Sequence, residues 1–312
     1  MNDTSIPTYG TGLLDPATLI HDPFHTFSVA SINVCGGTTP NFFSSLCEIG
    51  VQQGLDIIGV QETKVSKSKE KFLLPRKRCP YMGLWERAGV DHHSNGVGLL
   101  ITHPWFKFLQ STSHDGNGRG IMALFGFKHD LRVAVINCYV PSLSSHRTSY
   151  HNTILWAQNQ VESLRLQGAR VILLGDFNGV VNPSIDRSSD TYTTITPELP
   201  LFSWLQARSF TDTYRSLQPT TSLFTFRDIS RIDMIWASPD LTSYLLDTSS
   251  FTLTPPIRSD HSLITTTFDI HTLVNPTPHE TLKAHCTKGK KILFDEAEEE
   301  QWTAFREQVE DF

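Results

Sequence analysis

Residues 171–178 read Val-Ile-Leu-Leu-Gly-Asp-Phe-Asn, an apolar run that breaks at Gly175 and then presents Asp176 and Asn178. A short apolar run that ends at a glycine is typical of a buried strand, and polar side chains directly after such a strand lie where α/β sheets bind ligands. Asp and Asn after a strand are also frequent turn formers. This stretch by itself leaves both a reactive site and a plain turn open.

Four other fragments show the same pattern, in which side chains with oxygen or nitrogen atoms lie within an apolar run or next to it. They contain Asn33 (27–34), Glu62 (57–64), Asp233 (232–237), and Asp260 with His261 (259–268). Such side chains at strand ends are what a divalent metal with oxygen ligands and a phosphate group require. The five fragments together predict one polar site built from several strands.

The order of these motifs resembles that of the endonuclease/exonuclease/phosphatase superfamily. Its members include exonuclease III-type abasic endonucleases, DNase I and the endonuclease domains of non-LTR (LINE-type) retrotransposons. The shared pattern covers residues 26–270 and runs as Asn, Gln-Glu-Thr-Lys, Asn-x-Tyr-x-Pro, Gly-Asp-Phe-Asn, Arg-Ile-Asp and Ser-Asp-His. The resemblance implies an α/β fold of four layers, in which two packed mixed β-sheets are flanked by helices.

The hydrophobic pattern of the same region alternates strand-like and helix-like segments. Short apolar runs predict strands at Thr26–Asn33, Leu55–Gln61, Val97–Thr102, Ile121–Phe127, Arg132–Val140, Val171–Gly175, Ile232–Ala237 and Leu263–Phe268. Longer amphipathic stretches predict helices at Asn41–Gly54, His151–Gln167 and Leu201–Ala207. Residues 126–131, between two of the strands, favour a hairpin.

We expect one catalytic domain at 25–272, because α/β folds of about 250 residues commonly form a single domain. Residues 1–24 are interrupted by prolines and glycines and are expected to form a flexible leader. Residues 273–312 combine a proline-containing linker with an amphipathic helix near 294–309. This tail is either a junction to a following domain or a helix that docks on the catalytic domain.

The formal net charge of −6 is unusual for a protein that binds nucleic acid, because Lys and Arg neutralise phosphates in such complexes. The charge is unevenly distributed along the chain. Residues 295–300 are mostly acidic, whereas residues 64–78 contain a run of Lys and Arg next to Glu62. The basic run is either a face for nucleic acid or an exposed, solvated loop.

The five cysteines are odd in number and lack Cys-x-x-Cys spacing, which argues against a disulfide framework and against a zinc site. Cys35 and Cys138 are expected to pack in the interior. The chain has no apolar stretch of the about 18 residues that a membrane helix needs, and its start lacks the features of a signal peptide. We expect a protein of a reducing intracellular compartment that is not secreted.

Hydrolysis of a phosphodiester needs a cation that spreads charge, a group that orients water, and donors for the phosphate oxygens. Glu62 suits a hard cation such as Mg²⁺, with Mn²⁺ as a substitute, and the resemblance adds Asn33 and Asp260 as ligands. Asp176 is the candidate that orients or deprotonates water. Asn178 is expected to donate to the phosphate or to the developing oxyanion.

The remaining candidates contact the phosphate or the leaving oxygen. His261 is expected to contact the phosphate while Asp233 fixes its tautomer and favours its charged form. Tyr139 is the candidate donor or general acid near the leaving oxygen. The resemblance adds the hydroxyls of Thr225 and Ser259 as phosphate contacts, and Arg119 is a candidate contact to the nucleic-acid backbone.

The subfamily depends on the short segment Arg227–Ser230, which joins Thr-Phe to Arg-Ile-Asp. Abasic endonucleases carry a longer segment here, which supplies an aromatic wall for a flipped-out sugar. The motifs at 61–64, 118–122 and 136–141 look closest to retrotransposon endonucleases. The resemblance thus implies a Mg²⁺-dependent enzyme that nicks double-stranded DNA in the nucleus and leaves a 3′-hydroxyl that primes reverse transcription.

This interpretation also implies a partner, the reverse transcriptase domain of the same polyprotein. Three alternatives stay open at this point. The chain could be an abasic-site repair endonuclease, a phosphatase or phosphodiesterase that acts on small or lipid phosphates, or an inactive copy that binds DNA.

Overall fold

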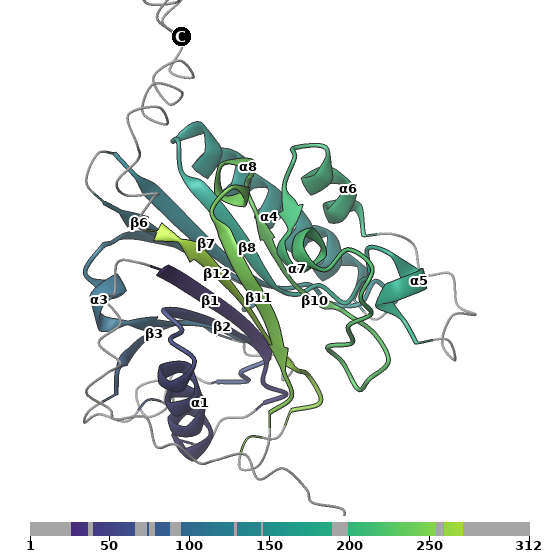
Figure 1. Cartoon of the computed structure of the whole chain (residues 1–312), viewed down its shortest axis with the longest axis horizontal. Coiled ribbons are helices and arrows are strands. Elements are labelled where there is room, and N and C mark those ends of the chain that lie inside the picture. Colours follow the sequence, from purple (N-terminus) through teal and green to yellow (C-terminus); the bar gives the residue numbers. More distant parts are fainter. Residues whose placement is uncertain are drawn as a thin grey trace, which may run out of the picture. The chain divides into compact units, whose positions relative to one another are not determined.

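The computed structural model describes residues 26–36, 40–65, 74, 79–87, 95–127, 130–144, 146–188, 199–253, 257 and 259–270 (Figure 1). Contacts divide the chain into two compact units, Met1–Val274 and Asn275–Phe312, and all described residues belong to the first. The expected leader at 1–24, most of the basic run at 64–78 and the expected tail at 273–312 lie outside the described residues. None of the described helices is long and apolar enough to cross a membrane.

Two six-stranded sheets form the centre of this region (Figure 1). The first has the order β11-β12-β1-β2-β4-β3, with β1 (Thr26–Asn33), β2 (Ile57–Gln61), β3 (Tyr81–Glu86), β4 (Val97–Thr102), β11 (Leu245–Phe251) and β12 (Leu263–Asp269). The second has the order β5-β6-β7-β8-β10-β9, with β5 (Leu109–His114), β6 (Gly120–Gly126), β7 (Arg132–Tyr139), β8 (Arg170–Asp176), β9 (Thr211–Asp212) and β10 (Asp233–Ala237). Both sheets are mixed, because β1 and β2 pair in parallel, as do β7 and β8, while the other pairs are antiparallel.

Helices cover the outer faces of both sheets (Figure 1). α1 (Pro40–Gln52) packs on the first sheet, and α4 (Arg147–Leu166) and α6 (Pro200–Gln206) pack on the second. The other described helices are short: α3 (His103–Phe106), α5 (Pro183–Asp186), α7 (Thr213–Leu217) and α8 (Pro239–Thr242). The expected α/β sandwich of two mixed sheets flanked by helices is confirmed.

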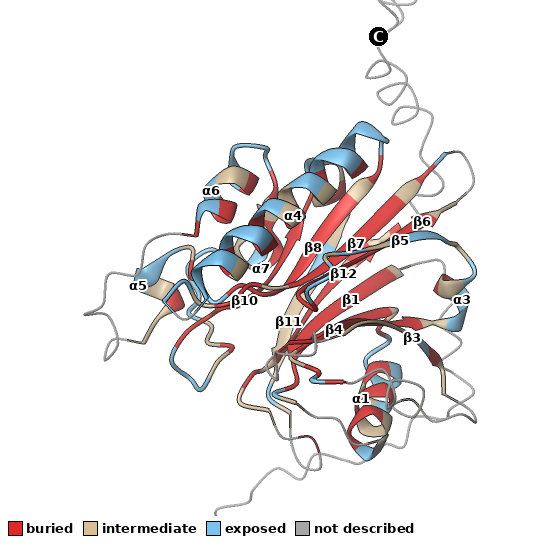
Figure 2. Cartoon of the chain, turned by 180° about the vertical axis from the view of Figure 1, so that it is seen from behind, coloured by how far each residue is buried: buried red, intermediate tan, exposed pale blue. Residues whose placement is uncertain are grey.

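The core consists of three apolar clusters, one for each interface between layers. Side chains such as Val29, Val135 and Leu174 meet between the two sheets. The second cluster joins α4 and α6 to the second sheet, and the third joins α1 to the first sheet. Figure 2 shows the result, in which the central strands are buried and the outer face of α4 is exposed.

The strand register brings the ends of several strands to the same edge. Asn33 at the end of β1 pairs with Gln61, and Tyr139 at the end of β7 pairs with Asp176. Gly175 makes the close approach of β7 and β8 possible, because its φ is +148° and a Cβ here would overlap the carbonyl oxygen of Cys138. The glycine after the apolar run is therefore required by the backbone that presents Asp176.

A buried polar link fixes the two sheets relative to each other near this edge. Asn137 on β7 donates to the backbone carbonyls of Val60 at 3.0 Å and Gly98 at 2.8 Å. Gln61 on β2 donates to Asn137 at 2.6 Å. A shift of one sheet against the other would leave these buried polar groups without hydrogen bonds, which costs free energy. The link therefore holds the strand ends that carry the site in register.

The predicted elements are present, with shifts of a few residues at their ends. The hairpin expected at 126–131 joins the antiparallel pair β6 and β7, although residues 128–129 of its turn lie outside the described part. The sequence prediction missed β3, β5, β9 and β11, which are the four edge strands. β5, for example, reads Leu-Gln-Ser-Thr-Ser-His and is mostly exposed, so it lacks the apolar pattern of a central strand.

Candidate active site

The residues predicted from strand-end motifs meet at one edge of the two sheets. Asn33 ends β1, Glu62 follows β2, and Asp176 ends β8. Asp233 begins β10 directly opposite Asp176. The edge opens into a cleft of about 560 Å³, which is lined by Cys35, Glu62, Lys64, Asp176, Asn178, Phe226, Arg227, Ile232, Ser259, Asp260 and His261.

Five residues that line this cleft have a left-handed backbone, and three of them, Cys35, Glu62 and Asn178, lie in the turns directly after strands. The φ angles are 47° at Cys35, 50° at Glu62 and 47° at Asn178. Non-glycine residues rarely adopt positive φ, and such strained residues cluster at functional sites. The turns after β1, β2 and β8 thus all use an uncommon backbone conformation to aim side chains at the cleft.

Asn33 joins two of the predicted carboxylates. Its side chain is fully buried, and its amide nitrogen donates to Glu62 at 3.1 Å and to Asp176 at 2.9 Å. Its amide oxygen accepts from the backbone N–H of Cys35 at 3.0 Å. In this orientation the oxygen does not face Glu62, so these contacts favour a role that fixes the carboxylates over the expected role as a metal ligand.

Asp176 is a buried carboxylate next to another carboxylate. It is 1% exposed, and the backbone N–H of Asn178 donates to it at 3.0 Å. Burial, with the charge of Asp233 added, raises the pKa of Asp176 to about 7. The side-chain amide of Asn178 donates to the carbonyl of Val140 at 3.0 Å, which leaves a second amide hydrogen for a ligand in the cleft.

Asp233 and His261 form the predicted acid–histidine pair. The Nδ1 atom of His261 lies 2.9 Å from the carboxylate of Asp233, so Nε2 is left for the cleft. Burial alone would lower the pKa of His261, but the charge and hydrogen bond of Asp233 outweigh it and raise the pKa to about 9. The imidazole is therefore cationic at neutral pH and suited to bind a phosphate.

The two hydroxyls expected to contact phosphate hold this pair in place. Thr225 is 1% exposed, and its oxygen accepts from the backbone N–H groups of Ile232 and Asp233, each at 3.1 Å. Ser259 donates to the carbonyl of Asn33 at 2.6 Å and accepts from the backbone N–H of His261 at 3.0 Å. Ser259 lines the cleft, whereas Thr225 is buried behind it and its contacts favour a positioning role over the expected phosphate contact.

Tyr139 and Arg119 lie next to each other, and both interact with Glu62. The guanidinium carbon of Arg119 is 5.2 Å from the centre of the Tyr139 ring. Burial and the charges of Glu62 and Asp176 raise the pKa of Tyr139 well above its ordinary value, so the phenol stays protonated and able to donate. Arg119 is only 2% exposed, so the expected direct contact with a DNA backbone is replaced by a contact with Tyr139.

Asp260 has two partners that the motif analysis did not predict. Arg227 forms an ion pair with it at 2.7 Å, and the thiol of Cys35 donates to it at 2.6 Å. Burial alone would raise the pKa of Asp260, but the hydrogen bonds from Cys35 and Arg227 lower it below its ordinary value. The expectation that Cys35 packs in the interior was wrong, because this cysteine is exposed and faces the cleft; Cys138 is buried as predicted.

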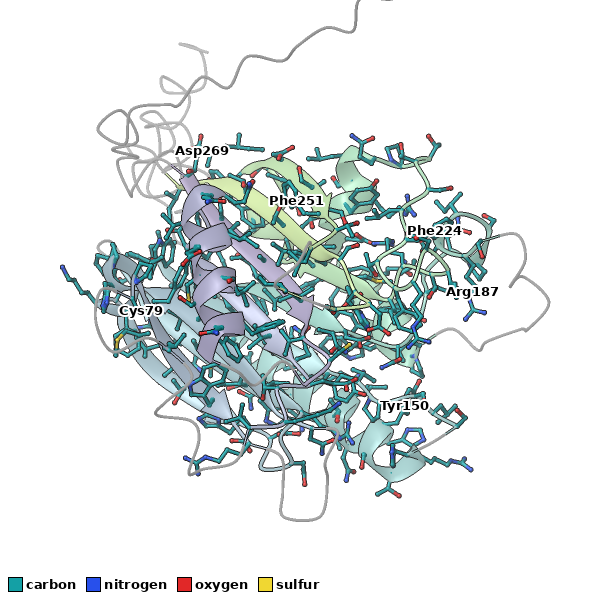
Figure 3. The ribbon with its side chains drawn as sticks, turned by 90° about the horizontal axis from the view of Figure 1, so that it is seen from below. Cys79, Tyr150, Arg187, Phe224, Phe251 and Asp269 are labelled. Atoms are coloured by element: carbon teal, nitrogen blue, oxygen red, sulfur yellow. The ribbon has the colours of Figure 1, made fainter. Side chains whose placement is uncertain are left out.

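A buried charge network supports the segment that leads into Asp233. Arg231 is 1% exposed and contacts Asp186 at 2.8 Å and Asp212 at 2.6 Å, and Arg215 also pairs with Asp186. Arg187, the residue directly after Asp186, is labelled in Figure 3 and marks where this network lies. Sequence reasoning missed Asp186, because no local pattern distinguishes this aspartate from a surface one.

The motif positions agree with a known family. A model of the Endonuclease/Exonuclease/phosphatase family matches residues 30–261. The chain belongs to this family. Membership confirms the prediction of a hydrolase that acts on phosphate ester bonds as a phosphodiesterase or endonuclease.

Solved structures of other proteins share this fold of the Endonuclease/Exonuclease/phosphatase family. AP endonuclease LMAP from Leishmania major is 19% identical, with a TM-score of 0.64 over 80% of this chain and 89% of that one. An AP endonuclease from Archaeoglobus fulgidus is 21% identical, with a TM-score of 0.59 over 78% and 99%. The 3′-5′ exonuclease NExo from Neisseria meningitidis is 20% identical, with a TM-score of 0.59 over 78% and 100%. A comparison with curated protein sequences gives no match.

The family generally uses divalent metal ions, and the cleft offers suitable ligands. The carboxylates of Glu62 and Asp260 both line it, and Glu62 is partly exposed with Lys64 at 3.4 Å. Mg²⁺ binds one or two carboxylates and keeps several waters, which fits two acids at an open cleft. Among the described residues, two further groups bring three potential ligand atoms within 4.8 Å of one another: Asp176 with Asp233 and His261, and Cys35 with Asp260 and His261.

Proposed function

We propose that this protein is a Mg²⁺-dependent endonuclease that nicks duplex DNA and leaves a 3′-hydroxyl, which in a retroelement primes reverse transcription. Mn²⁺ is the substitute ion. The observation that carries the proposal is the cleft itself, in which a cationic His261 and the buried acid Asp176 face the same space as Glu62. Action on chromosomal DNA places the enzyme in the nucleus, with a reverse transcriptase domain of the same polyprotein as its partner.

Different side chains of this protein carry out the steps of the hydrolysis. Water attacks phosphorus, the bond from phosphorus to the 3′ oxygen breaks, and a 3′-hydroxyl and a 5′-phosphate result. Asp176 orients the water and accepts its proton, since burial raises its pKa toward neutrality. A divalent ion held by Glu62 and Asp260 would supply positive charge that spreads the negative charge of the phosphate.

Hydrogen-bond donors of the cleft stabilise the charge that develops on the phosphate. The Nε2–H group of cationic His261 and the free amide hydrogen of Asn178 donate to the oxygens that do not break away. Tyr139 does not line the cleft itself, but it lies next to the cleft residue Glu62, stays protonated and is assigned the role of donor to the leaving oxygen. Arg119, in contact with the ring of Tyr139, holds the phenol in position.

The turn after Thr225 supports a retrotransposon-type enzyme over an abasic endonuclease. Residues 226–230 form a tight turn, in which the N–H of Ile229 donates to the carbonyl of Phe226 at 2.9 Å. Arg227 is tied to Asp260, and the ring of Phe226 packs on His261 with centroids 4.9 Å apart. A turn committed to these contacts provides no wall for a flipped-out sugar.

Abasic-site repair is the second candidate, because two of the similar solved structures are AP endonucleases by name. A supercoiled plasmid and a pair of short duplexes, one intact and one with a single abasic site, separate the candidates. We expect Mg²⁺-dependent nicking of the intact plasmid, blocked by a chelator, with similar rates on both duplexes. A strong preference for the abasic duplex would make the repair function correct, and hydrolysis of small phosphate esters without plasmid nicking would contradict both.

The pH dependence of nicking follows from the two shifted groups. Activity should rise through a pH of about 7 as Asp176 loses its proton, and it should fall through a pH of about 9 as His261 loses its charge. The measurement is kcat/KM for plasmid nicking across acidic to alkaline buffers at fixed Mg²⁺. The Asp233→Asn variant is the control, since removal of this negative charge should move the alkaline limb to lower pH. An unchanged alkaline limb in that variant would contradict the role of the pair.

A further inference from the structure

Cys35 lies at the mouth of the cleft in a position that its sequence context does not suggest. It follows β1 with a φ of 47°, and its side chain is exposed. Its sulfur is 2.6 Å from Oδ1 of Asp260, although the two residues are 225 positions apart in the chain. Linear spacing of cysteines argued against a zinc site, but the fold creates a grouping that linear spacing cannot reveal.

A third potential ligand completes the group. Nε2 of His261 is 4.0 Å from Oδ1 of Asp260, and the ligand atoms of Cys35, Asp260 and His261 all lie within 4.8 Å of one another. The other ring nitrogen of His261 is held by Asp233 at 2.9 Å. A carboxylate behind a histidine is the usual support for a histidine that binds a metal through its other nitrogen.

We propose that Cys35, Asp260 and His261 form a binding site for Zn²⁺. One sulfur, one nitrogen and one carboxylate oxygen are ligand types that zinc accepts, and three protein ligands leave a fourth position for water. Zinc holds such atoms at about 2.0–2.3 Å, so two ligand atoms on one tetrahedral zinc lie roughly 3.3–3.7 Å apart. The sulfur of Cys35 and Oδ1 of Asp260, now 2.6 Å apart, must therefore separate by about 1 Å, while Nε2 of His261 must approach both by about 1 Å. Mg²⁺ prefers oxygen ligands throughout, so the sulfur selects zinc over magnesium.

The second oxygen of Asp260 does not compete with this arrangement. Arg227 contacts Oδ2 at 2.7 Å, which leaves Oδ1 for the ion. When zinc binds, it replaces two protons, the thiol proton that Cys35 shares with Asp260 and the Nε2 proton of the cationic His261, and both pass to the buffer. The backbone around Cys35 is already in the conformation that aims the sulfur at the other two ligands.

The site has a functional consequence that rests on the proposed nuclease function. Zinc would occupy Asp260, proposed to hold Mg²⁺, and His261, proposed to contact the phosphate. Both groups would then be lost to catalysis. Zinc is therefore expected to be an inhibitor of this enzyme, not a substitute for magnesium.

Cobalt tests the site directly, because Co²⁺ takes zinc sites and gives a near-ultraviolet charge-transfer band when a thiolate binds it. The full chain is titrated with Co²⁺, and the cobalt is then displaced with Zn²⁺. We expect the band in the wild-type protein and its loss in the Cys35→Ser variant, with at least about a tenfold weaker zinc affinity. Cys79→Ser is the matched control, since Cys79 (labelled in Figure 3) precedes the edge strand β3, and it should leave the band intact.

The outcomes separate the site from the nuclease function, because metal binding is measured without DNA. No band in the wild-type protein, or a band that survives Cys35→Ser, would overturn the site. In the nicking assay each protein is compared with its own activity without zinc. Cys35→Ser should need about ten times more zinc for half inhibition, in line with its weaker affinity. Equal inhibition of both proteins despite the loss of the band would overturn the inhibitory role.

Discussion

Replacement of His261 by alanine should reduce DNA nicking by at least about 100-fold, the scale of losing one electrostatic stabiliser in an active site. The imidazole is held cationic by Asp233, and it lines the cleft with the nitrogen that Asp233 does not bind. Its charge acts on negative charge that develops in the transition state, so its loss should lower kcat more than it raises KM. Glu62→Ala should cause a loss of similar size through the metal.

The measurement is the rate of plasmid nicking at saturating Mg²⁺, with circular dichroism to show that the fold persists. His146→Ala is the matched control, since His146 is exposed at the start of α4 and makes no side-chain capping hydrogen bond. That variant should nick at the wild-type rate. A His261→Ala protein with a wild-type spectrum and more than a tenth of the activity would mean that the imidazole does not contact the phosphate.

The central strands were predictable from sequence because burial on both faces leaves a visible apolar run. β8 reads Arg-Val-Ile-Leu-Leu-Gly-Asp and is buried along nearly its whole length. Edge strands lack this signal, since solvent covers one of their sides. β11 reads Leu-Leu-Asp-Thr-Ser-Ser-Phe with no buried residue, so only its pairing with β12 identifies it as a strand.

The candidate site was predictable where its residues follow buried strands. Asp176 and Glu62 come directly after apolar runs, and the parallel pairing of such strands brings their ends together. The sequence contains no comparable signal that predicts whether a polar side chain is buried. Arg119 stands between two glycines, which is typical of an exposed loop, but the fold covers it almost completely.

Contacts between segments that are distant in the chain could not be predicted from the sequence, for a different reason. Cys35 meets Asp260 only after β1 and β12 have paired, and Arg231 meets Asp186 only after β8 and β10 have paired. No hydrophobic period encodes such a pairing, because each partner is a single polar residue in a loop or a short element. The same argument explains why the zinc site proposed above leaves no trace in cysteine spacing.

Asp186→Ala should destabilise the protein by about 3–5 kcal/mol, the usual cost of removing one partner from a buried ion pair. Asp186 is 0% exposed and accepts from both Arg231 and Arg215. Burial alone would raise the pKa of Asp186, but these two arginines outweigh it and lower the pKa. A lowered folded-state pKa means that this stabilisation is present at neutral pH and is lost as the pH falls through the folded-state pKa.

The test is the free energy of unfolding from urea denaturation at neutral and acidic pH. The difference between wild type and Asp186→Ala should be largest at neutral pH and should shrink in acid. Glu162→Ala is the matched control, because its pair with Arg208 is exposed and should contribute no more than about 1 kcal/mol.

The double variant Asp186→Ala with Arg231→Met tests the cause of this loss of stability. It shows whether the loss comes from the buried guanidinium of Arg231, which Asp186 no longer neutralises. In Asp186→Ala the buried guanidinium of Arg231 keeps only Asp212 as a carboxylate partner, and the double variant removes this partly neutralised charge, so it should be less destabilised than the sum of the two single variants. Arg231 also leads directly into Asp233, so Asp186→Ala should lower nicking as well, by misplacing the pair with His261. If the losses of stability in the two single variants simply add in the double variant, the cost does not come from an unneutralised charge. If Asp186→Ala nicks DNA at the wild-type rate, the network does not position the active site.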